Sequence, residues 1–250
     1  MKKAKIITVT SVKGGTGKTT FALNLAATFA LKKKRVLVID TDLASGDIAA
    51  RLDVGYEKDL YHCYEDIRNH TFDQVEDYVR PYKDGIDIIP APKDPRYANR
   101  IDSSFLTYLL SKVSLKYEVI ILDTNHLLSS INLLAFDYSD YILFIMNNEC
   151  MNLKGMRTMS AIFEDMESDK MKIVLNDSTR KESGEYSIAD MKNIMKREID
   201  FRIPSSFYQK SYNKYTIDGK IFLLESRVRQ KCKKAYKVYS LIADVLLKED

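Results

Sequence analysis

Tryptophan is absent from the 250-residue sequence, and cysteine, proline and glycine are scarce, with 3, 5 and 9 residues. So little glycine and proline excludes collagen-like and low-complexity chains, and a 45% hydrophobic content excludes intrinsic disorder. No apolar run approaches the roughly 20 residues of a membrane-spanning helix, and Lys13 interrupts the N-terminal apolar stretch before a signal peptide could form. Because no cysteines form a Cys-x-x-Cys pair, neither a disulfide framework nor a zinc site is expected. These absences indicate a globular cytoplasmic protein.

Positive charge is concentrated in one segment. Lysine and arginine exceed aspartate and glutamate by 39 − 35 = 4. Arg227–Lys237 holds six basic side chains and no acidic one, so the other 239 residues sum to −2. Any attraction to a polyanion is therefore expected from this segment.

Short apolar runs alternate with amphipathic stretches along the chain. The runs are nearly uninterrupted, which is typical of parallel strands covered on both faces. They comprise Lys5–Ser11, Val36–Asp40, Ile86–Ile89, Val119–Asp123, Tyr141–Met146 and Lys172–Asn176. The expected helices between them are Thr19–Leu31, Ser103–Val113, Asn152–Met166 and Ser187–Lys196. We predict one doubly wound, mostly parallel α/β domain over residues 1–250, with Gly55–Lys83 forming helices beside the sheet.

A glycine-rich loop joins the first strand to the first helix. In SVKGGTGKTT, backbone N–H groups and the helix dipole would converge on phosphate, and the glycines let the backbone curl closely. Lys18 would reach the β- and γ-phosphates, and the Thr19 hydroxyl would face Mg²⁺. The alternative to a phosphate-binding loop is a glycine-rich turn with lysines nearby that binds no ligand. The predicted nucleotide-binding residues here are Gly14, Gly15, Thr16, Gly17, Lys18, Thr19 and Thr20.

The loop departs from the strict phosphate-loop pattern, because Val12 stands where the first glycine belongs and a second lysine, Lys13, follows it. In this form, KGGTGKT, it resembles the deviant Walker A motif of the MinD/ParA superfamily of P-loop ATPases. The resemblance implies ATP and Mg²⁺ as cofactors and a homodimer that forms with ATP. It also implies that Lys13 is a catalytic lysine that crosses the dimer interface to the partner's nucleotide. Outside this motif, Lys13 would be an ordinary solvated lysine.

Acidic residues end two of the expected strands. Asp40 ends the second strand, and Asp42 follows two residues later. Asp123 ends the strand YEVIILD, and all three lie at the sheet edge where such folds bind ligands. The resemblance implies that Thr19, Asp40 and Asp123 belong to the Mg²⁺ shell and that Asp42 orients the attacking water. The alternative is surface acids that cap a following helix. The segment after Asp123 would be the γ-phosphate sensor, switch II, although many relatives have proline where Asn125 stands.

Two later features resemble the adenine contacts of the same family. Asn176 stands at the carboxyl end of a predicted strand, where a family asparagine bonds the base through its amide. Phe201–Ser205 resembles the loop that closes over the base with backbone groups, which implies Pro204 and Ser205 as nucleotide contacts.

Several strings resemble one branch of the superfamily, the pilus-assembly ATPases TadZ and CpaE. They are DTDLASGDIAARLDV, IIPAPKDP, LDTNHLLSS, VLNDSTRKESGEYSIADM and IPSSFYQKSYNKYTIDGKIFL. This resemblance implies an ATPase switch that positions a Tad (Flp) pilus or secretion machine through a protein partner, recruited to a cell pole or the inner face of the membrane. Many such relatives begin with a receiver-like domain, whereas this chain begins directly at the first strand. The alternatives are a ParA- or MinD-like partition or septum-positioning ATPase, and a nucleotide-bound scaffold with little turnover.

The C-terminal segment has an apolar stripe that predicts one helix from about Glu225 to Leu247. The stripe consists of Val228, Cys232, Ala235, Tyr239, Ile242 and Leu246. We expect it to pack on the sheet while the lysines face water. A DNA-binding basic face and a membrane-docking helix, both using Arg227–Lys237, are the less favoured alternatives.

Overall fold

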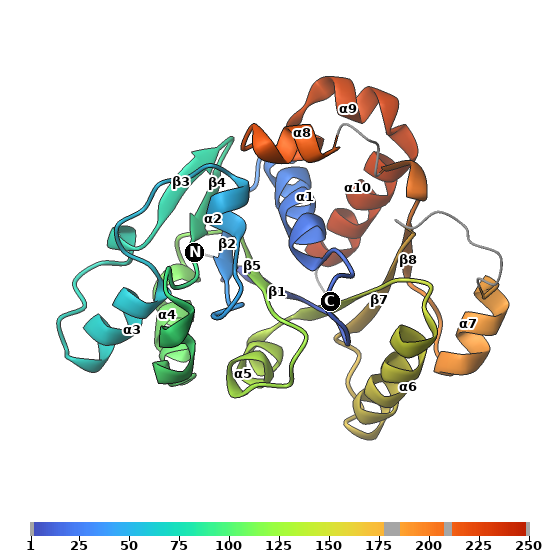
Figure 1. Cartoon of the computed structure of the whole chain (residues 1–250), viewed down its shortest axis with the longest axis horizontal. Helices are drawn as coiled ribbons and strands as arrows, with labels where there is room; N and C mark the ends of the chain where they lie inside the picture. The colour runs from blue at the N-terminus through green and yellow to red at the C-terminus, as the bar shows by residue number, and fades with distance from the viewer. Residues whose placement is uncertain (1–2, 178–185, 208–211, 249–250) are drawn as a thin grey trace.

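A computed structural model describes residues 3–177, 186–207 and 212–248. Its centre is an eight-stranded sheet in the order β3-β4-β2-β5-β1-β6-β7-β8 (Figure 1). Every strand pairing is parallel except that between β3 and β4, which confirms the predicted fold class. The strands are β1 (Lys5–Thr10), β2 (Val36–Asp40), β3 (Arg80–Lys83), β4 (Ile86–Ile89), β5 (Val119–Asp123), β6 (Tyr141–Met146), β7 (Met171–Asn176) and β8 (Phe201–Ile203).

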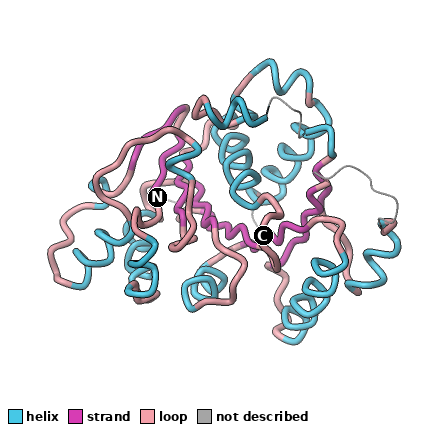
Figure 2. The backbone as a smooth tube through the Cα atoms, viewed as in Figure 1, coloured by secondary structure: helices cyan, strands magenta, loops and turns pink. Residues whose placement is uncertain are grey.

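Helices cover both faces of the sheet (Figure 2). Helix α1, which is buried along nearly its whole length, lies with α10 on one face, and α4 to α7 lie on the other (Figure 1). Strand side chains alternate between the two layers, so Val38 packs with α1 whereas Leu37 packs with α4. The helices are α1 (Lys18–Leu31), α2 (Ile48–Arg51), α3 (Leu60–Arg68), α4 (Phe105–Val113), α5 (Ser130–Tyr138), α6 (Cys150–Asp165), α7 (Ile188–Met195), α8 (Tyr212–Ile217), α9 (Ser226–Lys231) and α10 (Lys233–Leu247).

The segment Gly55–Lys83 differs from the prediction of helices alone. Helix α3 lies there, but Arg80–Lys83 forms the antiparallel edge strand β3. Its ladder is irregular between Pro81 and Lys83, and proline is tolerated at such a sheet edge. Because only two of its four residues are half-buried and the others are exposed, β3 lacks the apolar run that identified the other strands.

The C-terminal stripe is buried as predicted, but the single helix from Glu225 to Leu247 is wrong. Cys232 leaves helical geometry, with ψ of 40°, and separates α9 from α10. Its thiol lies 3.8 Å from the carbonyl oxygen of Ser206, and all six stripe residues remain buried across the break. In the described part of the chain, no helix combines the length and the apolar character needed to span a bilayer.

Candidate functional site

The glycine-rich loop lies between β1 and α1, at the carboxyl edge of the sheet. Gly15 and Gly17 have φ of 79° and 91°, a left-handed backbone that only glycine adopts without strain. Gly17 caps α1, whose first turn holds no acidic residue and receives no side-chain cap. The N–H groups at this helix start are therefore without a side-chain acceptor, which suits an anion.

Lys18 connects the loop to the acidic residues. Its Nζ donates to Ser11 Oγ at 3.1 Å. Burial lowers the pKa of Lys18, whereas the negative charges of Asp123 and Asp42 act in the opposite direction. The Lys18 ammonium group thus contacts Ser11 and also lies in the electrostatic field of two carboxylates.

Asp40 and Asp123 lie side by side, because they are register partners at the ends of β2 and β5. Each is 1% exposed. Asp40 Oδ2 accepts a hydrogen bond from the Ile48 N–H at 3.1 Å, and Asp123 is hydrogen-bonded to the Thr19 side chain. Oδ1 of each carboxyl group has no hydrogen-bond partner among the described residues.

Burial dominates the electrostatics of this pair. It raises the pKa of Asp123 to about 7, despite the Thr19 hydrogen bond and the charge of Lys18. Burial, followed by repulsion from Asp123, also raises the pKa of Asp40 well above its usual range. Two such carboxyl groups retain a proton near neutral pH unless a cation compensates their charge.

The residues around this pair fit a magnesium ion. Two buried carboxyl groups with unpartnered oxygens and a neighbouring threonine hydroxyl are the oxygen ligands that Mg²⁺ prefers. No group of three or more His, Cys, Asp or Glu side chains within the described ranges could hold a metal by itself. This agrees with Mg²⁺, which is held by one or two carboxylates together with waters and substrate phosphates.

A tight turn positions Asp42 at the rim of the site. Asp42 Oδ1 accepts from the Ser45 N–H at 3.2 Å, and its carbonyl oxygen accepts from Gly46 at 2.7 Å. Gly46 itself approaches Asp40 so closely that a Cβ at this position would lie 2.5 Å from Asp40 Oδ1. Asp42 is half-buried, and its negative charge acts to raise the pKa values of Lys18 and Asp123.

Lys13 lies outside this cluster. Its exposed Nζ forms an ion pair with Glu149 Oε2 at 2.9 Å, just before the first residue of α6. Glu149 was not predicted from the sequence. Its only signal in the sequence is an acidic residue between a predicted strand and a predicted helix, which many surface residues share.

Asn125 organises the loop after β5. Its Oδ1 accepts from the Leu127 N–H at 2.9 Å and from Asn132 Nδ2 at 2.8 Å. Asn132 Nδ2 also donates to the Leu127 carbonyl oxygen at 2.6 Å, from a fully buried position on α5. An amide pair thus fixes the turn after β5. Asn132 was not predicted from the sequence.

Asn176 lies next to the glycine-rich loop on its other side. The buried Asn176 donates through Nδ2 to the Thr16 carbonyl oxygen at 2.8 Å, whereas its Oδ1 has no partner among the described residues. Asn176 is in register with Ile203, so Pro204 and Ser205 follow at the same sheet edge. Phe201–Ile203, which we expected to be part of a loop, instead forms β8, because it pairs with β7.

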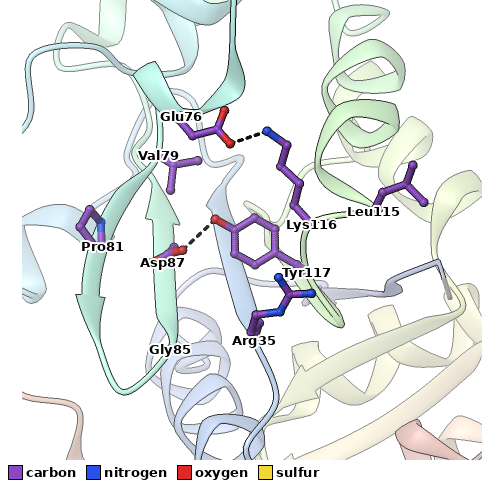
Figure 3. A pocket seen from close by; sticks show the side chains of 9 residues that line it. All are labelled: Arg35, Glu76, Val79, Pro81, Gly85, Asp87, Leu115, Lys116 and Tyr117. Atoms are coloured by element: carbon purple, nitrogen blue, oxygen red, sulfur yellow. Dashed lines mark hydrogen bonds and ion pairs between the residues drawn. The ribbon is translucent and has the colours of Figure 1, made fainter. Parts of the chain in front are cut away.

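A hollow of about 700 Å³ lies at the opposite edge of the sheet (Figure 3). Its wall includes Arg35, Asp87 and Tyr117, which lie at or before the starts of β2, β4 and β5. Tyr117 donates to Asp87 at 2.8 Å, as Figure 3 shows. Because it opens at the amino ends of the strands, this hollow is not part of the site formed by the acidic residues.

A family model described as "AAA domain" matches residues 4–176. A ParA family protein of Chlamydia trachomatis is 30% identical over 174 residues, covering 66% of this chain and 67% of its own length. The chromosome-partitioning ATPase Soj of Thermus thermophilus is 27% identical over 215 residues, covering 85% and 81%. A protein of Pseudomonas putida is 31% identical over 160 residues, but the match spans only 60% of its length.

Solved structures share the fold over nearly the whole chain. The cell division ATPase MinD of Pyrococcus furiosus superimposes with a TM-score of 0.80 at 20% identity, covering 97% of this chain and 99% of its own. The septum site-determining protein MinD of Pyrococcus horikoshii, complexed with Mg-ADP, has a TM-score of 0.78 at 19% identity, covering 98% and 96%. At these identities the likeness establishes the fold.

Proposed function

The chain belongs to the MinD/ParA superfamily of P-loop ATPases, and from this premise we propose that it binds ATP with Mg²⁺ and hydrolyses it as a dimerising molecular switch. The observation that carries the proposal is the buried pair Asp40 and Asp123, next to Thr19 and Lys18 under the glycine-rich loop. Burying two carboxyl groups together is costly, and a bound cation would compensate that cost.

Each residue group would have a distinct role in binding. The loop N–H groups and Lys18 would bind the phosphates, and the amide of Asn176 would contact the base beside Pro204 and Ser205. Thr19, Asp40 and Asp123 would hold Mg²⁺, which when bound neutralises charge on the phosphate oxygens. The remaining loop contacts would come from Gly14, Gly15, Thr16, Gly17 and Thr20.

Asp42 would orient the water that attacks the γ-phosphate. Its half-buried position is held by the Ser45 and Gly46 N–H groups, and its negative charge acts on Lys18. Positioning and electrostatic stabilisation supply most of the rate in phosphoryl transfer, so removing this carboxylate should slow hydrolysis and leave binding intact.

Lys13 would reach the nucleotide of a second copy. For this it must leave Glu149, and an exposed ion pair of this kind is worth only about 0–1 kcal/mol. Exchange of Glu149 for a partner's phosphates would therefore cost little, which supports a dimer that forms only when ATP is bound.

The switch would position a cellular assembly. Relatives named for chromosome partition and septum-site determination support a positioning role, and the TadZ- and CpaE-like strings are what supports a Tad (Flp) pilus machine. One observation favours a second candidate function, the binding of DNA. Five exposed cations of α9 and α10 have no acidic partner among the described residues, as a DNA-binding face requires. They are Arg227, Lys231, Lys233, Lys234 and Lys237.

Light scattering tests the switch directly. Asp42→Ala should form a dimer of about twice 28.8 kDa with Mg·ATP and a monomer with Mg·ADP. Adding Lys13→Ala should abolish the dimer, whereas adding Lys154→Ala, at an exposed lysine of α6, should leave it intact. Equal masses with the two nucleotides would contradict the dimer switch. Loss of ATP binding by Lys18→Ala in calorimetry checks the phosphate loop separately.

A further inference from the structure

An apolar groove runs between α5 and α6, the two helices that lie side by side beneath the sheet in Figure 1. It consists of two adjoining hollows of about 340 and 270 Å³, which share Leu128, Phe136 and Met159. We call it the α5–α6 groove. One end is bounded by Val12 of the glycine-rich loop and by switch II, and the other by Met166 beyond the end of α6.

Exposed apolar side chains concentrate at this groove. The described residues include eleven large hydrophobic side chains that are exposed, and five of them line it. Contiguous exposed apolar surface of this kind marks an interaction site, whereas single exposed residues need no explanation. The five are Leu127, Leu128, Leu133, Ile162 and Met166.

The Met166 end of the groove is acidic. Asp137 lines the groove there, and Glu164, Asp165, Glu167 and Asp169 lie around the end of α6. None of these five carboxylates forms an ion pair with another described residue. Lys170 is the lining cation, and its Nζ donates to the carbonyl oxygen of Asp137 at 3.2 Å. The carboxyl end of the α6 dipole adds further negative potential, so an occupant must be cationic at this end.

Charge also decides between kinds of occupant. An anionic membrane surface would be repelled by this acidic end. A second copy that used the same groove would bring its own acidic end into the interface, and among the described lining residues it would offer only Lys170 as a cation to match the first. Both walls are helical, and at 16 residues α6 is about 24 Å long, enough for roughly four turns of a helix laid along it.

We propose that the α5–α6 groove binds an amphipathic helix of a partner protein that carries lysine or arginine at one end. Apolar side chains spaced i, i+3 or i+4, and i+7 would enter the two hollows, and the basic end would lie over Asp137 and Asp165. The groove itself does not depend on the nucleotide proposal, so binding is tested without nucleotide.

The probe is a fluorescein-labelled peptide of about 16 residues with a leucine row at helical spacing and two lysines at one end. Two versions carry the lysines at opposite ends, and one of them should bind the full chain in fluorescence anisotropy. Ile162→Glu should weaken that binding by at least about tenfold. Leu241→Glu, at a leucine on α10 that is 54% exposed, should leave it unchanged.

The charge requirement is tested by reversal. A peptide with glutamates in place of the lysines should bind the native chain at least about tenfold more weakly. In the Asp165→Lys chain, the difference in affinity between the lysine and glutamate peptides should become smaller or change sign. Circular dichroism checks that each variant is folded, which we expect because Ile162 is 39% exposed.

Three outcomes of the binding measurements would overturn the proposal. They are equal binding by native and Ile162→Glu chains, equal binding of the lysine and glutamate peptides, and binding to anionic vesicles that Ile162→Glu abolishes. Doubling of the mass of the free chain that Ile162→Glu reverses would assign the groove to a second copy and overturn it as well. None of these results would alter ATP binding by the phosphate loop, so the two proposals fail separately.

Discussion

At the scale of single residues, burial disfavours the charged forms of Asp40 and Asp123. Asp40 and Asp123 are neighbours because parallel strands of matched register end at the same height. Their burial raises both pKa values, so without a cation the pair retains a proton that free aspartate would lose. The positive charge of Lys18 is therefore not enough to offset the burial of Asp123.

This arrangement predicts a pH dependence of stability in the absence of nucleotide and Mg²⁺. The pKa of Asp123 is about 7 in the folded chain and about 3.9 when unfolded, so the folded state binds more protons between these values. Stability therefore falls as pH rises from about 4 to 7, because the slope follows the protons bound by the unfolded state minus those bound by the folded state.

Asp123→Asn removes the contribution of Asp123 to that dependence. We expect the variant to unfold at a higher temperature than the native chain at pH 8, by roughly 4–8 °C for a difference on the order of 2 kcal/mol. The difference in unfolding temperature between the two chains should disappear toward pH 4–5. Melting curves of both chains at each pH measure it, with Asp169→Asn at an exposed acid as the control. A difference in melting temperature that stays constant with pH would contradict the raised pKa of Asp123.

The sequence placed most of the candidate site residues but not their supports. Lys18, Asp40, Asp123 and Asn176 stand at strand or helix ends, and the position of an end follows from the hydrophobic pattern. Glu149 and Asn132 were missed, because their partners lie on other elements and only the tertiary structure brings Lys13 and Asn125 to them.

At the scale of elements, switch II is held by side chains rather than by backbone rigidity. Asn132→Ala removes one amide that donates to Asn125 Oδ1 and to the Leu127 carbonyl oxygen. We expect a loss of about 1–3 kcal/mol of unfolding free energy. Hydrogen exchange at residues 124–128 should also become faster. Ser130→Ala, at an exposed position of the same helix, should change neither quantity, and unchanged exchange in Asn132→Ala would refute the role of the amide pair.

The elements themselves were predictable to different degrees. Four buried parallel strands, such as Val119–Asp123, have the predicted bounds, because an uninterrupted apolar run in a parallel sheet admits few alternatives. Strand β3 and the break at Cys232 were not predicted. The first contains Pro81 and lies at an edge, and the second interrupts a helical pattern that is otherwise continuous.

At the scale of the whole molecule, the basic surface has five available cations rather than six. The guanidinium group of Arg229 donates to the carbonyl oxygens of Leu223 and Leu224, both at 2.7 Å, and so supports the chain just before α9. The sequence could not separate it from Arg227, which is exposed.

For the DNA-binding form of the switch, five phosphate contacts predict a log–log salt slope of about −4.5 on duplex DNA. Arg227→Ala should reduce the slope by about 1, whereas Arg229→Ala should lower the melting temperature and leave the slope unchanged. Filter binding at graded salt measures this. A flat slope, or no binding at about 50 mM salt, would exclude DNA as the surface on which the switch works.

The order of strands in the sheet also determines at which stage of folding the candidate nucleotide site can form. Strand β1 pairs with β5 and β6, so Lys5 meets Val119 and Ile7 meets Tyr141. The contact between Asn176 and Thr16 spans 160 residues. Contacts this distant in sequence form late in folding, because the chain between them must first be closed into a loop. The glycine-rich loop leaves the ribosome before the strands that surround it, so the proposed nucleotide site would be complete only when β7 has joined the sheet.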